Sequence, residues 1–237
     1  MNSLIVFVKA PVPGKVKTRL QMPLSAPQAA RVYEAFVRDT VDCARRSGGA
    51  AVSVAYEPHP KRPDLTWLED SPPWFPQADG DLGARLIAAF DRAFRAGAEK
   101  VVVIGSDCPD LDPDILRQAL ARLDDAEVVL GPAEDGGYYL VGLRAPKPHL
   151  FMKMEWSNAF VFERTLERLR LRGESFAVLP ERADVDTFGD LKSLSRRICG
   201  RESAALHTRA AIEDLILEDL FRMPVGEGVN PWTGDSK

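Results

Sequence analysis

The chain has 237 residues, enough for one large α/β domain or two small ones with a buried core. Its formal net charge of −4 disfavours a general nucleic-acid-binding protein, so any basic patch must be local. The three cysteines are far apart and form no Cys-x-x-Cys pair, which argues against a disulfide framework or a zinc site. We recognise no signal peptide, and no apolar run approaches the ~20 residues of a membrane span, so we expect a cytoplasmic protein.

The first half of the chain alternates predicted strands and helices. We expect strands at residues 3–8, 51–56 and 100–105, a helix at 25–46, and a second helix that contains Leu82 to Phe94 and ends at Gly97. Ser25 and Gln28 have the spacing of a capping box at the start of the first helix. The proline- and tryptophan-rich segment 57–75 is predicted to be an irregular excursion.

The second half continues the alternation. Strands are predicted at 127–130, 138–143 and 176–179, and helices after Asp112-Pro113 and at 158–171, 188–199 and 208–221. This order predicts a three-layer α/β/α architecture with a mostly parallel sheet. We expect residues 1–200 to form a single domain, and residues 201–237 to be a C-terminal helix and tail that pack on this domain or extend from it.

One carboxylate follows the most apolar predicted strand. Val101 to Ile104 are four consecutive branched apolar residues, which predict a buried central strand, and the turn Gly105-Ser-Asp-Cys-Pro-Asp-Leu111 comes next. Open α/β sheets bind ligands at the carboxyl ends of their strands. We therefore interpret Asp107 as a catalytic residue and as a ligand of Mg²⁺ or Mn²⁺, since these hard cations prefer oxygen ligands and bridge phosphates. Asp112 is interpreted as a helix cap, and Asp110 could be either a cap or a functional residue.

A basic loop follows the first predicted strand and precedes a helix. Its cations could contact a diphosphate, and its glycine would let the backbone approach the phosphates. The alternative is a solvated basic loop. A second polar turn begins the helix after Gln77, where Asp81 could instead simply cap the helix. The nucleotide- or phosphate-binding candidates are Lys9, Pro11, Gly14, Lys15, Lys17, Arg19, Asp81 and Arg85.

The loop from Glu134 to Tyr138 is the candidate acceptor site. Asp135 could bind acceptor hydroxyls or serve as a catalytic base, and the paired glycines allow unusual backbone conformations. The alternative is an ordinary Asp-Gly hairpin turn. The acceptor-binding candidates are Asp135, Gly136, Gly137, Tyr138, Trp156 and Ser157.

Asp186 is the candidate second metal ligand. Thr187 can cap the following helix, which leaves the Asp186 carboxylate free for another role. The alternative is that Asp186 only adds negative charge at the helix N-terminus.

Six motifs in order resemble one family, the DUF2064 group, also called radical-SAM/selenodomain-associated transferases. The resemblance covers about residues 3 to 200 and rests on KAPVPGKVKTRL at 9–20, QADGDLGARL at 77–86, GSDCPDL at 105–111, GPAEDGGYYLVGL at 131–143, Trp156-Ser157 and DVDT at 184–187. It implies a nucleotide-diphospho-sugar transferase (GT-A-like) fold, with Asp107 at the metal-binding strand end, Lys9 to Arg19 at the nucleotide and Asp186 completing the metal site. The usual Asp-x-Asp is absent, because Pro109 stands where its second Asp would fall.

The leading hypothesis is a metal-dependent glycosyltransferase that uses a nucleoside diphosphate sugar and a small-molecule acceptor. The second is nucleotidyl transfer from a nucleoside triphosphate, because the basic loop and the Asp-Cys-Pro turn also resemble guanylyltransferases that activate phospholactate in coenzyme F420 synthesis. The third is a non-catalytic nucleotide-binding domain. We expect no nucleic-acid partner and no membrane span, and an oligomer is compatible with the sequence.

Overall fold

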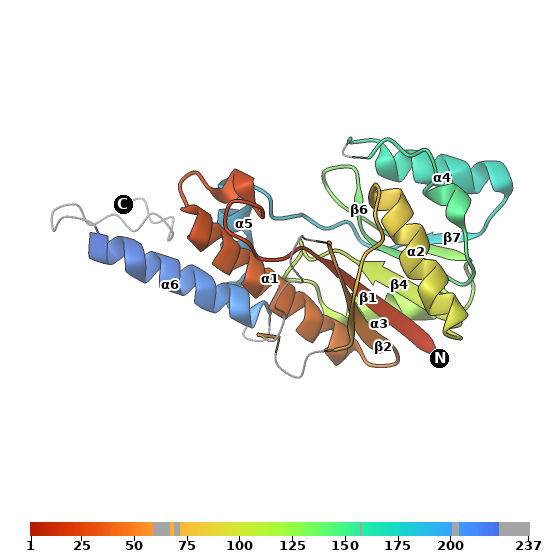
Figure 1. The fold of residues 1–237 in the computed structure, drawn as a ribbon, viewed down its shortest axis with the longest axis horizontal. Coiled ribbons are helices and arrows are strands. Elements are labelled where there is room, and N and C mark those ends of the chain that lie inside the picture. The colour runs from red at the N-terminus through yellow and green to blue at the C-terminus, as the bar shows by residue number, and fades with distance from the viewer. Residues whose placement is uncertain (59–66, 69–71, 157, 201–203, 223–237) are drawn as a thin grey trace.

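The computed structural model describes residues 1–58, 67–68, 72–156, 158–200 and 204–222 (Figure 1). Within them one sheet has the strand order β3-β2-β1-β4-β6-β5-β7. Strand β6 runs antiparallel to β4 and β5, and the other pairings are parallel. The strands are β1 Asn2–Val8, β2 Ala51–Tyr56, β3 Trp74–Pro76, β4 Lys100–Ile104, β5 Val128–Pro132, β6 Tyr138–Leu143 and β7 Phe176–Val178. The mostly parallel sheet predicted from the sequence is confirmed.

Helices cover both faces of this sheet. The α-helices are α1 Ala26–Ser47, α2 Leu82–Arg95, α3 Pro113–Arg122, α4 Val161–Arg172, α5 Phe188–Ile198 and α6 Leu206–Arg222, and the 3-10 helices are η1 Thr18–Leu20 and η2 Pro148–Leu150. In β4, Val102 and Ile104 belong to the apolar core shared with α1, α3, α5 and α6, whereas Val101 and Val103 belong to the core shared with α2 and α4. A central strand buried on both faces explains the unbroken apolar run in the sequence.

The segment after β2 differs from the prediction. We expected residues 57–75 to be wholly irregular, but Trp74 and Phe75 pair with Val54 and Ala55, so that β3 extends the sheet at this edge. Only three residues long and ending in Pro76, β3 carries little of the period-2 pattern by which strands are recognised. Much of the remaining segment, at 59–66 and 69–71, lies outside the described residues.

Side-chain caps begin the helices at the predicted positions. Ser25 and Gln28 form a reciprocal capping box on α1, and Asp112 caps α3, with Pro113 as the first helical residue. Thr187 and Asp190 form a second capping box on α5. These local contacts satisfy amide groups that have no partner within the helix. They also fix where the loops between strand and helix end, which positions the loops around the site.

Helix α6 is held against α1 by a buried carboxylate. Asp39 of α1 accepts hydrogen bonds from the backbone amides of His207 (3.0 Å) and Thr208 (2.8 Å) at the start of α6. Burial raises the pKa of Asp39, and these hydrogen bonds oppose that rise. The apolar side chains Ile212 and Leu215 complete the contact with the core. No helix in the part of the chain that the structure describes is both long and apolar enough to cross a bilayer.

We predict that Asp39→Ala lowers the free energy of unfolding by on the order of 2 kcal/mol, because it leaves two amides of α6 without their acceptor. Chemical denaturation measures this loss. The matched control is Asp42→Ala, which also removes one negative charge from α1. Asp42 is partly exposed and pairs with the His207 side chain, so its loss should lower the free energy of unfolding by less than about 1 kcal/mol. Equal losses in the two variants would contradict the role given to Asp39.

Candidate functional site

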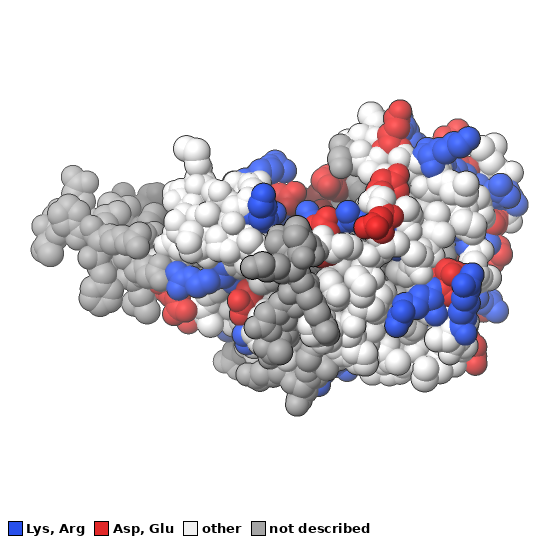
Figure 2. All heavy atoms as spheres, viewed as in Figure 1, with Lys and Arg blue, Asp and Glu red and all other residues white. Residues whose placement is uncertain are grey.

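A cavity of about 520 Å³ opens at the carboxyl ends of β1 and β4. Figure 2 shows acidic and basic side chains gathered at a hollow in the surface, between the part over α1 and α5 and the part over α2 and α4. Because parallel strands end at the same sheet edge, this is where an open α/β sheet binds ligands. The charged residues that line the cavity are Lys9, Lys15, Lys17, Arg19, Glu57, Arg85, Asp107 and Asp186.

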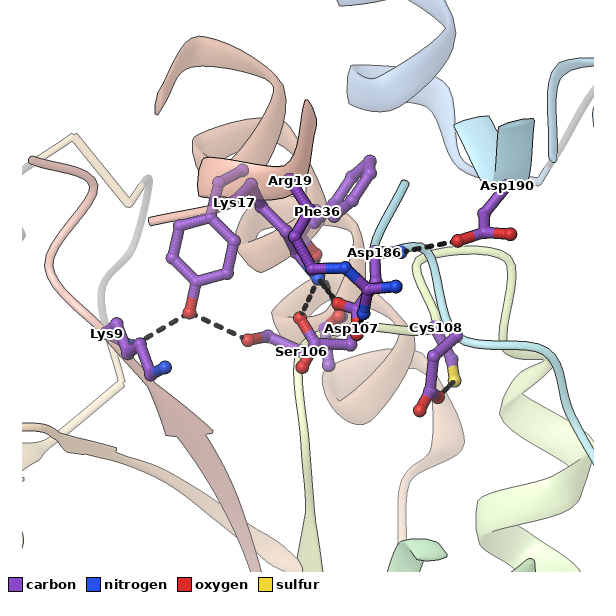
Figure 3. A network of polar contacts seen from close by, with 12 residues as sticks. Lys9, Lys17, Arg19, Phe36, Ser106, Asp107, Cys108, Asp186 and Asp190 are labelled. Atoms are coloured by element: carbon purple, nitrogen blue, oxygen red, sulfur yellow. Dashed lines mark hydrogen bonds and ion pairs between the residues drawn. The ribbon is translucent and has the colours of Figure 1, made fainter. Parts of the chain in front are cut away.

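One lysine joins the two carboxylates that we predicted to bind metal. Lys17 Nζ lies 2.5 Å from Asp107 Oδ1 and 3.0 Å from Asp186 Oδ1, and the three side chains converge in Figure 3. The Lys17 side chain is only 6% exposed, whereas those of Asp107 and Asp186 are 49% and 42% exposed. Arg19 Nη1 adds a longer contact of 3.4 Å to Asp186 Oδ2. Three segments far apart in the sequence therefore meet at this point.

The charge of Lys17 is maintained by these neighbours. Burial by itself lowers the pKa of Lys17, but the charges of Asp107 and Asp186 and their hydrogen bonds outweigh burial and raise it above the ordinary value. The Phe36 ring lies 5.7 Å from the ammonium and adds a cation–π contact. The ammonium is thus a fixed positive charge at the strand ends.

A buried tyrosine links the two strand-end loops. The Tyr33 hydroxyl accepts a hydrogen bond from the Lys9 amide at 2.8 Å and lies 3.0 Å from Ser106 Oγ (Figure 3). Burial, with a contribution from the charge of Asp107, raises the pKa of Tyr33 to about 12, so the phenol stays neutral. The loop after β1 and the loop after β4 are therefore both anchored to α1. Sequence analysis did not identify Tyr33, whose helical position predicts only core packing.

Asp186 lines the cavity, whereas Val185 and Thr187 on either side of it make backbone and capping contacts. The Val185 amide donates to the Asp107 carbonyl at 3.0 Å, so the segment before α5 runs beside the end of β4. Thr187 and Asp190 cap α5, as predicted for Thr187. The carboxylate of Asp186 is thus available to face Lys17 and Arg19. In contrast, Asp110 pairs with Arg197 at 3.0 Å and does not line the cavity.

The donor set suits a phosphate-bound divalent cation. Among the described residues, no three His, Cys, Asp or Glu side chains group as a metal cage. Mg²⁺, however, usually takes one or two carboxylates and completes its shell with water and substrate phosphates. Asp107 and Asp186 provide two carboxylates that already converge on one cation.

The other phosphate-binding candidates divide into two groups. Arg85 lines the cavity, where its guanidinium contacts Glu57 Oε1 at 2.7 Å, and Lys9 and Lys15 line it without an ion pair to any described residue. Asp81 caps α2 by accepting from the Ala84 amide. The residues outside the cavity lining are Pro11, Gly14 and Asp81.

The predicted acceptor loop forms the hairpin between β5 and β6. Asp135 Oδ1 accepts from the Gly137 amide at 2.8 Å, which is the Asp-Gly turn considered as the alternative. Gly136 has φ +87°, and a Cβ there would lie 2.1 Å from the Ala159 carbonyl oxygen, so only glycine fits. Of the acceptor candidates, Tyr138 lines the cavity and packs edge-on against Trp156, whereas Asp135, Gly136, Gly137 and Trp156 do not line it. Ser157 lies outside the described residues.

Asp184 is the site residue to which sequence analysis gave no role. The Cys108 thiol donates to Asp184 Oδ1 at 3.0 Å. Burial, assisted by the charges of Asp135, Asp107 and Asp186, raises the pKa of Asp184 to about 6. Burial likewise raises the pKa of Cys108 well above its usual value, so Cys108 is a packed thiol rather than a nucleophile. The signal in the sequence was the Asp-Val-Asp pattern, in which a buried valine stands between two carboxylates.

We predict that Asp184→Asn stabilises the metal-free protein at pH 8. The folded chain retains a proton on Asp184 up to about pH 6 that the unfolded chain releases near its ordinary pKa of 3.8, so stability falls as the pH rises through this window. The asparagine variant should remove this fall and gain about 1–3 kcal/mol at pH 8. Denaturant unfolding in EDTA from pH 4 to pH 8 measures it.

Asp125→Asn is the control for this pH series, since it removes the same charge from an exposed position that is not among the charges raising the pKa of Asp184. A stability difference between Asp184→Asn and the wild type that stays constant from pH 4 to pH 8, or an Asp184→Asn variant that is less stable than the wild type at pH 8, would contradict the assignment.

The fold has counterparts among solved structures. A candidate nucleotide-diphospho-sugar transferase from Desulfovibrio desulfuricans G20 is 34% identical, with a TM-score of 0.83 over 94% of this chain and 98% of its own. A cytidylyltransferase from Leptospira borgpetersenii serovar Hardjo-bovis is 15% identical, with a TM-score of 0.51 over 96% of this chain and 98% of its own. A nucleotidyl transferase from Methanothermobacter thermautotroptrophicus is 16% identical, with a TM-score of 0.53 over 85% of this chain and 100% of its own. The last two comparisons concern the fold alone.

No curated protein matches the chain. A family model does: residues 40–158 match DUF2064, described as an uncharacterized protein conserved in bacteria. The matched part contains β4, the turn with Asp107, and the β5–β6 hairpin. Together with the 34% identity over nearly the whole length of the Desulfovibrio structure, this shows that the chain belongs to the DUF2064 family.

Proposed function

We propose that the protein is a metal-dependent glycosyltransferase that uses a nucleoside diphosphate sugar as donor. The observation that carries this proposal is the cavity at the carboxyl ends of β1 and β4, where two carboxylates lie beside several cations. Carboxylates alone would repel a diphosphate, whereas together with a divalent cation they bind it. The related Desulfovibrio chain, a candidate nucleotide-diphospho-sugar transferase, supports the same substrate class.

In this proposal Asp107 and Asp186 hold Mg²⁺ or Mn²⁺, which when bound neutralises the negative charge of the leaving diphosphate. Lys9 and Lys15 are free to contact phosphate oxygens as point charges, and Arg19 can contact two oxygens at once. Arg85, which Glu57 holds at 2.7 Å, also lines the cavity and would contact the rest of the donor.

The acceptor enters from the side of the β5–β6 hairpin. Tyr138 forms the wall of the cavity there, and Asp135 stands beyond it as the candidate base or hydroxyl-binding group. Gly136 and Gly137 lie in the hairpin turn and Trp156 packs against Tyr138, while Ser157 is proposed as an acceptor contact from the sequence alone.

Nucleotidyl transfer is the second candidate, and the number of cations favours it. Lys9, Lys15, Lys17 and Arg19 all line one cavity, and a triphosphate carries more negative charge than a diphosphate sugar. The enzyme would then release pyrophosphate and leave the nucleotide on the product. The third candidate, a non-catalytic nucleotide-binding domain, corresponds to binding without turnover of any donor.

We predict that Asp107→Asn abolishes metal-dependent thermal stabilisation by nucleotides and lowers transferase activity by about 100-fold or more, the scale expected when charge stabilisation at a reacting phosphate is lost. Thermal unfolding with Mg²⁺ or Mn²⁺ and a panel of nucleotides measures the first effect. Asp186→Asn should act in the same direction. Asp114→Asn on α3, an exposed residue outside the cavity, is the control. Unchanged metal-dependent binding in Asp107→Asn would refute the assignment.

The two transferase reactions differ in their products. We expect nucleoside diphosphate sugars, rather than triphosphates, to give the larger metal-dependent stabilisation, and a nucleoside diphosphate to be released on turnover. Release of pyrophosphate from a nucleoside triphosphate would establish nucleotidyl transfer in place of sugar transfer. Coupled assays for phosphate-containing products separate the two outcomes.

A further inference from the structure

Lys17 differs from the other lysines of the cavity in one respect. Its side chain is 6% exposed and its ammonium contacts both Asp107 and Asp186, whereas Lys9 and Lys15 are exposed and form no ion pair with a described residue. Figure 3 shows the ammonium between the two carboxylates, with Phe36 beside it. Lys17 is therefore the counter-ion of the two carboxylates, whereas Lys9 and Lys15 are exposed cations of the same loop.

The ammonium occupies the volume that a shared metal ion would need. Oxygens of the two carboxylates lie 2.5 and 3.0 Å from the same nitrogen. A divalent cation held by both would lie at about 2.1 Å from each of these oxygens, within van der Waals distance of the present Nζ position. Two positive charges at such a distance repel strongly in a partly buried site. A metal ion bound to both of these oxygens and the ammonium in its present position therefore exclude each other.

We propose that Lys17 is an exchangeable counter-ion, which neutralises Asp107 and Asp186 in the metal-free protein and which a divalent cation must displace in order to bind. This inference rests on the metal binding in the proposed function and adds a competing residue to it. The metal alone should then bind weakly, because its binding also breaks two ion pairs.

The released ammonium needs a new anionic partner. A buried charge without one is costly, and a diphosphate in the same cavity would supply phosphate oxygens. Lys17 also has φ 44° and ψ 44°, a left-handed backbone conformation that is uncommon for a non-glycine residue, directly before η1. Metal and diphosphate would thus bind together more tightly than either binds alone.

The first test measures Mn²⁺ affinity without nucleotide, from the electron paramagnetic resonance signal of free Mn²⁺. Lys17→Met should bind Mn²⁺ about 10-fold or more tightly than the wild type, a difference that corresponds to ~1.4 kcal/mol. Lys15→Met is the matched control, because it removes the same charge from the same loop, and from the same cavity, without touching either carboxylate. Its Mn²⁺ affinity should change by less than about 2-fold, the general effect of one exposed charge at physiological salt.

The second test needs no substitution and so remains decisive if Lys17→Met folds poorly. Acetylation of lysines in the wild-type protein is followed residue by residue by peptide mass spectrometry. Lys17 should be protected in EDTA and become reactive as Mn²⁺ saturates, while Lys15 in the same sample reacts at one rate throughout.

The possible results separate the inference from the proposed function. Tighter Mn²⁺ binding in Lys17→Met alone, with exposure of Lys17 by the metal, supports displacement. Mn²⁺ binding that Lys17→Met leaves unchanged or weakens, or a Lys17 that stays protected at saturation, overturns the inference while leaving a metal-binding protein. Absence of Mn²⁺ binding in every variant overturns the inference together with the metal dependence of the proposed function.

Discussion

The ion pairs that Lys17 forms with Asp107 and Asp186 are the contacts on which the arrangement of the site depends. They join the loop after β1, the end of β4 and the segment before α5 at one charged point. Without the ammonium, two half-exposed carboxylates would repel each other at the edge of the sheet. The same interaction makes the site ready for a cation, because it directs both carboxylates toward one position.

Uncharged contacts support this charged centre. Tyr33 anchors the loops after β1 and β4 to α1, and the amide of Val185 binds the carbonyl of Asp107. These bonds fix the backbone, whereas the side chains of Asp107 and Asp186 stay partly exposed. A rigid backbone with accessible carboxylates is what a site requires if its cation is to be exchanged between a lysine and a metal. The Cys108 thiol donates to Asp184, whose pKa is raised by burial and, to a lesser extent, by the charges of three further carboxylates.

Much of the fold followed from local patterns. The apolar run from Val101 to Ile104 predicted a buried strand, and the caps at Ser25, Asp112 and Thr187 predicted where three helices begin, because capping is a contact between near neighbours in sequence. Strand β3 was missed because three residues are too few to show a hydrophobic pattern, and the strand is defined by its pairing with β2. Asp184 was passed over because its environment comes from Cys108, Asp107 and Asp135, all distant in the sequence.

The sequence by itself determined the mostly parallel α/β architecture, the position of Asp107 at a strand end and the availability of Asp186 next to a capping threonine. These follow from hydrophobic periodicity and helix capping, which act over a few residues. The tertiary structure alone decided that Lys17, among four cations of one loop, lies between the carboxylates, that Asp110 faces Arg197, and that Asp135 completes a hairpin turn outside the cavity lining. The physical reason is that an ion pair depends on where two charges meet in space, and residues 17, 107 and 186 are brought together only when the sheet and its crossover helices have packed.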